Sequence, residues 1–243
     1  MTTGPDHERI AHFLLRDVNR AIREYRMIRA GDRIAVAVSG GKDSLSLLRM
    51  LDIRRTFDPT PYELAAVHVR GDETGVTAPY APLEDWLAQQ RIMYRIVEPD
   101  ARQDEPPLTC QRCTWLRRKA IFLAAEMMGC NVVAFAHHAD DAAQTTLMNL
   151  LYGGQAVSLA PHAEYFSGHF RLIRPLIYLP ERDLARYARA ANFPPAPPAC
   201  PRAVQSRRQD IARMLDVPGP ERDQFRSNLL RAGLRRFADA KGS

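Results

Sequence analysis

Apolar positions follow two alternating periods along most of this chain, and this pattern predicts the order of its secondary structure. Short β-branched or apolar runs predict strands, whereas longer stretches with apolar residues every three or four positions predict helices. The predicted strands span residues 33–38, 63–69, 92–97 and 131–136, and the predicted helices span residues 45–53, 81–90, 111–128 and 139–151. We therefore expect βαβ units and a doubly wound, mostly parallel α/β sheet that helices cover on both faces.

Before residue 30 and after residue 154, the chain no longer alternates regularly between predicted strands and helices. Residues 6–29 carry apolar positions at helical spacing with arginines between them, which predicts an amphipathic helix that packs on the domain. After residue 154 we expect a loop to Gly168, a strand over 170–173, a helix over 181–191, the proline-rich run FPPAPPACP at 193–201, and arginine-rich helices over 205–215 and 221–237. The expected units are an N-terminal helix (1–30), an α/β domain (31–192) and a C-terminal basic region (193–243).

Composition and charge narrow the class of protein. With 46% hydrophobic and 26% charged residues in 243 positions, the chain has the composition of an ordinary globular protein. It contains no apolar run of the roughly 18 residues that span a membrane and no secretory signal pattern, so we expect a cytoplasmic protein without a membrane partner. Residues 174–243 hold 14 Lys and Arg against 7 Asp and Glu, which predicts that the C-terminal part binds a polyanion.

The hexapeptide SGGKDS, residues 39–44, directly follows the first predicted strand and precedes a helix. Its glycines allow backbone N–H groups to turn towards an anion, and the following helix directs its positive end to the same place. The spacing differs from that of a Walker A loop. The hexapeptide is therefore a predicted phosphate cradle.

Acidic and histidine residues follow the fourth predicted strand, at the same edge of a parallel sheet. They are His137, His138, Asp140 and Asp141. Carboxylates together with phosphate oxygens are preferred ligands of Mg²⁺, so Asp140, Asp141 and Asp43 are candidates for a magnesium site, although an aspartate at this place also caps a helix.

Two cysteines, Cys110 and Cys113, open the helix after the third strand with the spacing CxxC. A helix N-terminus favours thiolates, which suits metal ligation or sulfur chemistry. Cys130 lies a whole helix away and is expected to be a buried residue at the opposite edge of the sheet. Cys200 on the proline-rich loop is the remaining thiol that can join the pair, and three cysteines fit a four-iron cluster with one open iron, or a catalytic dithiol with a third partner, better than a closed zinc site.

The hexapeptide resembles the signature of the PP-loop ATP pyrophosphatases. Further segments resemble the tRNA 2-thiocytidine synthetase (TtcA) family: CxxC followed by RR, AHHADDAAQTTLMNLLYGG at 136–154, RPLIYLPERDLARYA at 174–188, and a cysteine ahead of QSRRQDIARML. The similarity covers roughly residues 30–215. Two departures are Ala136, where the family usually has glycine, and a single cysteine in the third segment.

This resemblance implies ATP-dependent thiolation of a cytidine at position 32 of tRNA. It implies a [4Fe-4S] cluster on Cys110, Cys113 and Cys200, adenylation of the C2 oxygen by ATP, and its replacement by sulfur bound through the free iron. We assign catalysis to Lys42, Asp43 and Asp141, and Mg²⁺ to Asp43 and Asp141. The residues assigned to ATP are Ser39, Gly40, Gly41, Lys42, Asp43, Ser44, His68, His137 and Asp140. Those assigned to tRNA are Arg117, Arg118, Arg202, Arg207, Arg208 and Arg213.

Several alternatives share these features. A uridine thiolase, a lysidine-type or amidating PP-loop ligase without a cluster, and an RNA-binding sensor that does not cleave ATP would each use the same cradle. A persulfide on Cys110 or Cys113 could replace the cluster-bound sulfur. Expected partners are tRNA, a sulfur donor such as a cysteine desulfurase, and a second copy of the chain in a homodimer.

Overall fold

A single six-stranded sheet forms the centre of the protein. The structure is a computed structural model that describes residues 5–70, 80–101, 104, 108–198, 207–216 and 221–239. Strands β1 (Asp32–Val38), β2 (Tyr62–Val69), β3 (Met93–Val97), β4 (Val132–Ala134), β5 (His162–Tyr165) and β6 (Phe170–Ile173) lie in the order β3-β2-β1-β4-β6-β5. All neighbouring strands are parallel except β5 and β6, which are antiparallel. The predicted fold class is confirmed.

Strand β5 was not predicted, because a loop was expected as far as Gly168. The strand has only four residues, HAEY, and lies at the edge of the sheet, where its side chains are partly or fully exposed. It forms a hairpin with β6 through Phe166 and Ser167, which both have positive φ. An exposed edge strand this short carries no alternation of apolar and polar positions, and the prediction therefore failed here.

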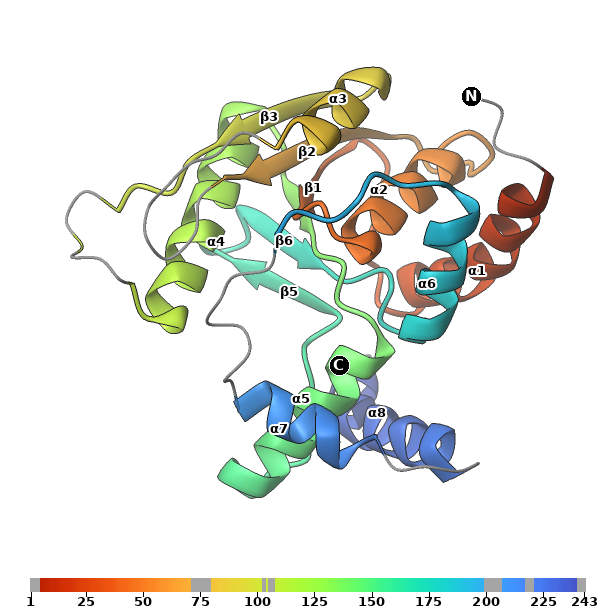
Figure 1. Cartoon of the computed structure of the whole chain (residues 1–243), viewed down its shortest axis with the longest axis vertical. Helices are drawn as coiled ribbons and strands as arrows, with labels where there is room; N and C mark the ends of the chain where they lie inside the picture. Colours follow the sequence, from red (N-terminus) through yellow and green to blue (C-terminus); the bar gives the residue numbers. More distant parts are fainter. Residues whose placement is uncertain are drawn as a thin grey trace.

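Helices cover both faces of the sheet, as expected (Figure 1). Helices α1 (Pro5–Glu24), α2 (Lys42–Arg54), α3 (Ala81–Gln89) and α6 (Glu181–Ala190) share one core with strand residues such as Ile34 and Val36. Helix α4 (Cys110–Met127) covers the other face and packs on Ala35, Val67 and Val133. Alternate residues of β1 thus belong to different cores, as the two-residue period of a strand requires.

The N-terminal helix is amphipathic, as its spacing predicts. Ala11, Leu14 and Val18 are almost completely buried in the same core as α2 and α6, whereas Phe13 is exposed. The helix ends at Glu24, five residues before the predicted end at residue 29. Arg26, with φ of 48°, has a left-handed backbone conformation that a helix cannot continue.

Three helices form a lobe at one end of the molecule: α5 (Ala139–Gly153), α7 (Arg207–Met214) and α8 (Glu221–Asp239) (Figure 1). Helix α8 approaches α5 closely at Gly233. A Cβ on Gly233 would lie 2.0 Å from Oγ1 of Thr146 and 2.8 Å from Cβ of Ser158. The Ser158 backbone N–H also donates to the Gly233 carbonyl at 3.0 Å. Only a glycine allows this packing.

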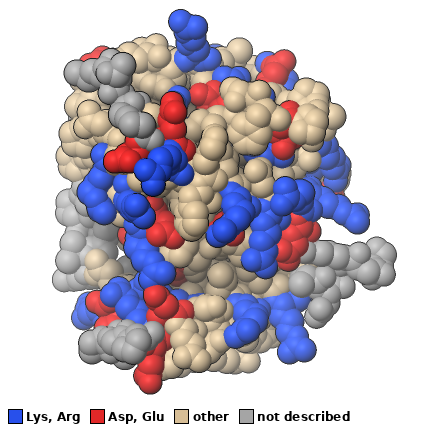
Figure 2. Space-filling model, turned by 90° about the vertical axis from the view of Figure 1, so that its right-hand side faces the viewer, with Lys and Arg blue, Asp and Glu red and all other residues tan. Residues whose placement is uncertain are grey.

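The described helices include none that is long and apolar enough to cross a membrane. On the face where α1, α6 and α8 lie, Lys and Arg side chains are numerous, with Asp and Glu side chains among them (Figure 2). Exposed ion pairs elsewhere on the surface include Arg213 with Asp210 on α7, and Arg182 of α6 forms an exposed pair with Asp223 of α8.

Candidate nucleotide and thiol site

The loop between β1 and α2 is held in shape by its own serines. The Ser39 backbone N–H donates to Oγ of Ser44 at 3.1 Å, and Oγ of Ser44 donates to the Gly41 carbonyl at 2.9 Å. Gly40 has φ of +86°, a conformation that L side chains rarely adopt. Gly41 is the N-cap of α2, so the positive end of the helix dipole lies at the loop. The loop thus has the shape of the predicted phosphate cradle, with its turn fixed by its own side chains.

A cavity of about 350 Å³ opens beside this loop. Its polar wall includes Ser39, Gly41, Asp43 and Ser44 of the loop region and His137 after β4. Thr114, Arg117 and Arg118 of α4 form the opposite wall, and Val67, Val69 and Phe135 add apolar surface. The cavity lies at the carboxyl ends of parallel strands, where ligands of doubly wound folds bind.

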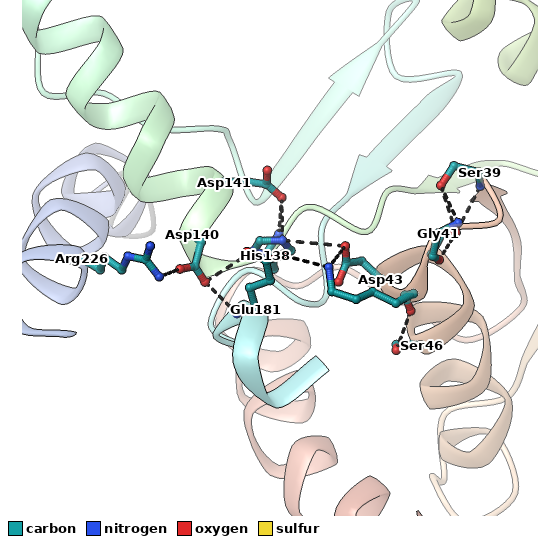
Figure 3. Close-up of polar contacts among 11 residues, drawn as sticks. Ser39, Gly41, Asp43, Ser46, His138, Asp140, Asp141, Glu181 and Arg226 are labelled. Carbon is teal, nitrogen blue, oxygen red and sulfur yellow. Dashed lines mark hydrogen bonds and ion pairs between the residues drawn. The ribbon is translucent and has the colours of Figure 1, made fainter. Parts of the chain in front are cut away.

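A chain of charged groups runs from the loop to α6 (Figure 3). The Lys42 ammonium lies 3.2 Å from Oδ2 of Asp43 and 2.9 Å from Oε1 of Glu181. Burial lowers the Lys42 pKa, but the hydrogen bonds to Glu181 and Asp43 and the negative charges of both carboxylates together outweigh it, so the pKa is raised overall. The hydrogen bond from Lys42 lowers the Glu181 pKa. Lys42 is thus held as a cation. Sequence reasoning missed Glu181, which is 139 positions from its partner.

One carboxylate oxygen of Asp43 is available to bind a ligand. Its Oδ1 is buried and has no hydrogen-bond partner among the described residues. Burial raises the pKa of Asp43, and the nearby charges of His138 and Lys42 oppose this shift only in part. A buried oxygen without a partner is costly unless a ligand completes it. The residue therefore fits a divalent cation bound with the phosphates of a nucleotide, although the described residues contain no group of three or more His, Cys, Asp and Glu that could hold a metal.

Asp141 and Asp140 point in different directions (Figure 3). Oδ2 of Asp141 accepts a hydrogen bond from the His138 backbone N–H at 3.1 Å and lies 3.4 Å from Nε2 of His138. Asp140 is buried, and its Oδ2 accepts from the Glu181 backbone N–H at 2.7 Å while its Oδ1 pairs with Arg226 of α8. The two carboxylates were predicted together, but the fold uses Asp140 to join three helices.

The other two histidines assigned to ATP, His137 and His68, also point to different surroundings. His137 lines the cavity, and Nε of Arg174 donates to its Nδ1 at 3.2 Å. Burial lowers the pKa of Arg174 to about 10. His68 is buried in β2, with Nδ1 2.8 Å from the Val38 carbonyl, and burial lowers its pKa. His68 is not among the residues that line the cavity, so its contact is with the protein core.

The CxxC cysteines lie in the first turn of α4, just before the residues of that helix that line the cavity, and are not themselves among the lining residues. Cys110 is the first residue of α4 and exposed, and Cys113 is one turn further and half-buried. Residues three apart share one helix face, and Thr114 and Arg117, which line the cavity, follow directly. Cys130 is buried, as predicted, and lies near Arg33 and Glu63 at the amino ends of β1 and β2. Burial raises its thiol pKa.

Some predicted residues cannot be placed. Cys200 and Arg202 lie outside the described residues, as do the side chains of Arg207 and Arg208. Arg118 lines the cavity, and Nη2 of Arg117 donates to the Val69 carbonyl at 2.9 Å. Arg213 on α7 is exposed and forms an ion pair at 3.2 Å with Asp210, three residues before it on the same helix.

Fold and phosphate loop together define the class of protein. The sequence model of the PP-loop domain family matches residues 14–194, more than half of the chain. A structural comparison agrees on the fold: the U34-tRNA thiolase NcsA from Methanococcus maripaludis, solved with its [4Fe-4S] cluster, aligns with a TM-score of 0.71 at 22% identity. The alignment covers 96% of this chain and 80% of that one.

Relatives of known name narrow the class further. The tRNA-cytidine(32) 2-sulfurtransferase of Anaeromyxobacter dehalogenans (strain 2CP-C) is 36% identical over 231 residues, which cover 92% of this chain and 79% of the relative. The enzyme of the same name from Alkalilimnicola ehrlichii is 38% identical over 215 residues, 86% of this chain and 67% of the relative. The chain belongs to the tRNA-cytidine(32) 2-sulfurtransferase family of PP-loop proteins, as its motifs indicated.

Proposed function

We propose that this chain replaces the C2 oxygen of cytidine 32 in tRNA with sulfur, at the expense of ATP. The observation that carries the proposal is the single cavity that joins the phosphate loop to the helix of the CxxC cysteines. Ser39, Gly41 and Asp43 line one side, and Thr114 and Arg117, which follow Cys113 within about one turn of α4, line the other. An enzyme that activates a base with ATP and then adds sulfur needs both groups within reach of one carbon atom.

In the first half of the reaction, ATP binds with its phosphates at residues 39–44. Lys42 and the loop N–H groups stabilise negative charge on the phosphates, and Asp43 with Asp141 would hold Mg²⁺, which would neutralise further phosphate charge. The cytidine O2 attacks the α phosphorus, and pyrophosphate leaves with the electron pair of the broken P–O bond. The result is a cytidine adenylated on O2, from whose C2 atom AMP is a good leaving group.

In the second half, sulfur bonds to C2 and AMP leaves with the former O2. Three thiols, from Cys110, Cys113 and Cys200, would hold a [4Fe-4S] cluster, which when bound leaves one iron without a protein ligand and can present sulfur to the base. The exposed position of Cys110 and the shared helix face of Cys113 fit such a group. Arg117 and Arg118 lie at the same wall and would contact the tRNA phosphates beside the target base.

The proposal includes partners. Besides tRNA, we expect a sulfur donor system such as a cysteine desulfurase, a homodimer, and a cytoplasmic location. Arg202, Arg207, Arg208 and Arg213 would extend the tRNA contact on the basic C-terminal region.

The test is mass spectrometry of nucleosides from bulk tRNA of cells with and without the gene. Loss of 2-thiocytidine alone is the expected result. Loss of another thionucleoside would overturn the cytidine substrate, and an unchanged profile would overturn thiolation altogether. Complementation with C110S, C113S or C200S should fail, whereas C130A, which removes a buried thiol at the other edge of the sheet, should restore the modification.

A further inference from the structure

An exposed tryptophan lies on the helix of the CxxC cysteines. Trp115 follows Cys113 by two positions in α4, and its exposed fraction is 50%. The other tryptophan of the chain, Trp86, is partly buried and packs edge to face on Phe193. Tryptophans are highly buried on average, so an indole that presents half of its surface to solvent is unusual. Packing of the core does not account for Trp115.

Trp115 borders the face of α4 that lines the cavity. Thr114, Arg117 and Arg118 are the first lining residues of this helix. Successive helical residues are about 100° apart, so Trp115 lies roughly 60° from Arg118 around the helix axis and about one turn before it. Residues three apart are neighbours on a helix surface. The indole therefore lies beside Arg118 at the rim of the cavity.

Two cations lie over the indole ring. The Arg112 guanidinium is 4.5 Å from the Trp115 ring centroid. Both carboxylate oxygens of Asp104 hold this guanidinium, at 2.7 Å from Nε and 3.0 Å from Nη2, so Arg112 restrains the orientation of the ring. The Lys119 ammonium is 5.4 Å from the centroid, on a flexible stem that can give way to another group. We assign no ligand contact to Lys119.

The surroundings of Trp115 fit RNA better than a second copy of the chain. Arg112 and Arg118 lie three positions before and three positions after it. In a symmetric dimer the same patch faces itself, which would bring these like charges together. RNA instead has phosphates that the cations attract and, in its loops, unpaired bases that stack on aromatic rings. The ligand whose chemistry matches this patch is an unpaired RNA base.

We propose that Trp115 is the platform on which an unpaired base next to the target nucleotide stacks, so that the RNA loop is positioned at the mouth of the cavity. This inference rests on the proposed function, because it takes an RNA nucleotide as the group that enters the cavity. Every base has a π-face, so the platform adds affinity for unpaired RNA without selecting a sequence. The phosphate loop takes no part in this contact, and ATP binding is therefore an independent readout.

Equilibrium binding of RNA tests the platform. The probes are an RNA hairpin whose loop contains the target cytidine, and a blunt duplex of the same length without unpaired bases. Trp115→Ala removes the ring, and Trp115→Phe keeps an aromatic face. Leu123→Ala is the matched control, because Leu123 lies about two turns further along α4 with an exposed fraction of 49%. The Kd for ATP and the thermal midpoint of each variant should stay at the wild-type values.

We expect W115A to raise the Kd for the hairpin by about 5- to 150-fold, the range that loss of one stacked base produces, and to leave the Kd for the duplex unchanged. W115F should recover most of the lost affinity, and L123A should bind both probes like the wild type. A wild-type Kd of W115A for the hairpin would overturn the proposal, and so would equal weakening of hairpin and duplex. Conversion of a dimer to a monomer by W115A would assign the ring to a protein interface instead.

Tryptophan fluorescence gives a readout that a merely structural role would not change. Trp86→Phe leaves Trp115 as the only tryptophan of the chain. A base that stacks on the indole should quench its emission, so we expect the hairpin to quench the W86F protein and the duplex to leave it unchanged. Unchanged emission at saturating hairpin would contradict stacking. If the hairpin quenches Trp115 while loss of the gene leaves every thionucleoside in place, the platform stands and the proposed function fails.

Discussion

Arg226 on α8 forms an ion pair with the buried carboxylate of Asp140 at the N-terminus of α5. The other oxygen of Asp140 accepts a hydrogen bond from the backbone of Glu181, whose side chain binds Lys42. The last helix of the chain is therefore connected to the lysine of the phosphate loop through two carboxylates. Loss of Arg226 would leave the charge of Asp140 buried without its counterion.

The first prediction concerns the stability of this connection. Arg226→Gln should lower the free energy of unfolding by about 3 kcal/mol, because an uncompensated buried charge is costly. Arg182→Gln breaks the exposed pair with Asp223 and should cost less than about 1 kcal/mol. Urea unfolding measures both values. The D140N/R226Q double variant should recover part of the loss, and equal effects of R226Q and R182Q would contradict the prediction.

Close packing of α8 on α5 gives the second prediction. Gly233→Ala places a methyl group against Thr146 and Ser158 and should destabilise the protein by about 1–3 kcal/mol, the usual effect of overpacking. Amide hydrogen exchange should increase along α8 more than in β1. Gly153→Ala is the control, since a Cβ there meets no atom within 4 Å. Unchanged exchange in α8 would show that the helices can separate without cost.

The third prediction concerns Lys42. Lys42→Gln should reduce tRNA-dependent release of pyrophosphate by about 100-fold or more, because it removes a fixed cation at the site where phosphate charge develops. Lys119→Gln is the matched control: this lysine of α4 lies over the Trp115 ring and should keep at least half of the activity. A pyrophosphate-release assay decides, and a K42Q variant with a tenth or more of the wild-type rate would refute the assignment.

The fourth prediction is a pH dependence of stability. Burial lowers the pKa of His68 below its ordinary value of 6.5, so the unfolded chain binds a proton there more readily than the folded one. The contribution of neutral His68 is complete above pH 6.5 and is lost as the pH falls below it, by at most about 1.4 kcal/mol per pH unit. His68→Asn should flatten this slope while its amide donates to the Val38 carbonyl.

His162 provides an internal comparison for this experiment. Burial lowers its pKa as well, so it contributes with the same sign. Urea unfolding at several pH values between 5 and 7 should show a smaller slope for H68N, a smaller slope for H162N, and the smallest for the double variant. A slope that H68N leaves unchanged would mean that His68 takes up its proton without opening the core.

The sequence predicted the parallel core and the phosphate loop because both depend on local patterns. Strand periodicity, the glycines at 40 and 41 and the CxxC spacing are each patterns that span only a few residues. The contacts that complete the site do not. Glu181 and Arg226 each act on a partner far along the chain, and no local pattern distinguishes them from other charged residues.

Asp140 shows this difference most clearly. Its place beside Asp141 after the fourth strand made both candidates for the nucleotide site, with Asp141 assigned to catalysis and Mg²⁺ and Asp140 to ATP. In a helix, neighbouring residues project about 100° apart, so one carboxylate turns to His138 and the other to α6 and α8. The position of Arg226 on α8 shows that Asp140 is the carboxylate that joins the helices and Asp141 the one beside His138.

The distance between Asp140 and Arg226 along the chain also has a consequence for synthesis on the ribosome. Arg226 follows Asp140 by 86 residues, which takes roughly 4–17 s to translate at typical rates. During that interval the strands up to β6 can already pair, whereas the Asp140 carboxylate waits for its counterion. The nucleotide edge therefore lacks this ion pair until α8 has been made, and a ribosome that stalls before α8 leaves Asp140 without the counterion that Arg226 provides.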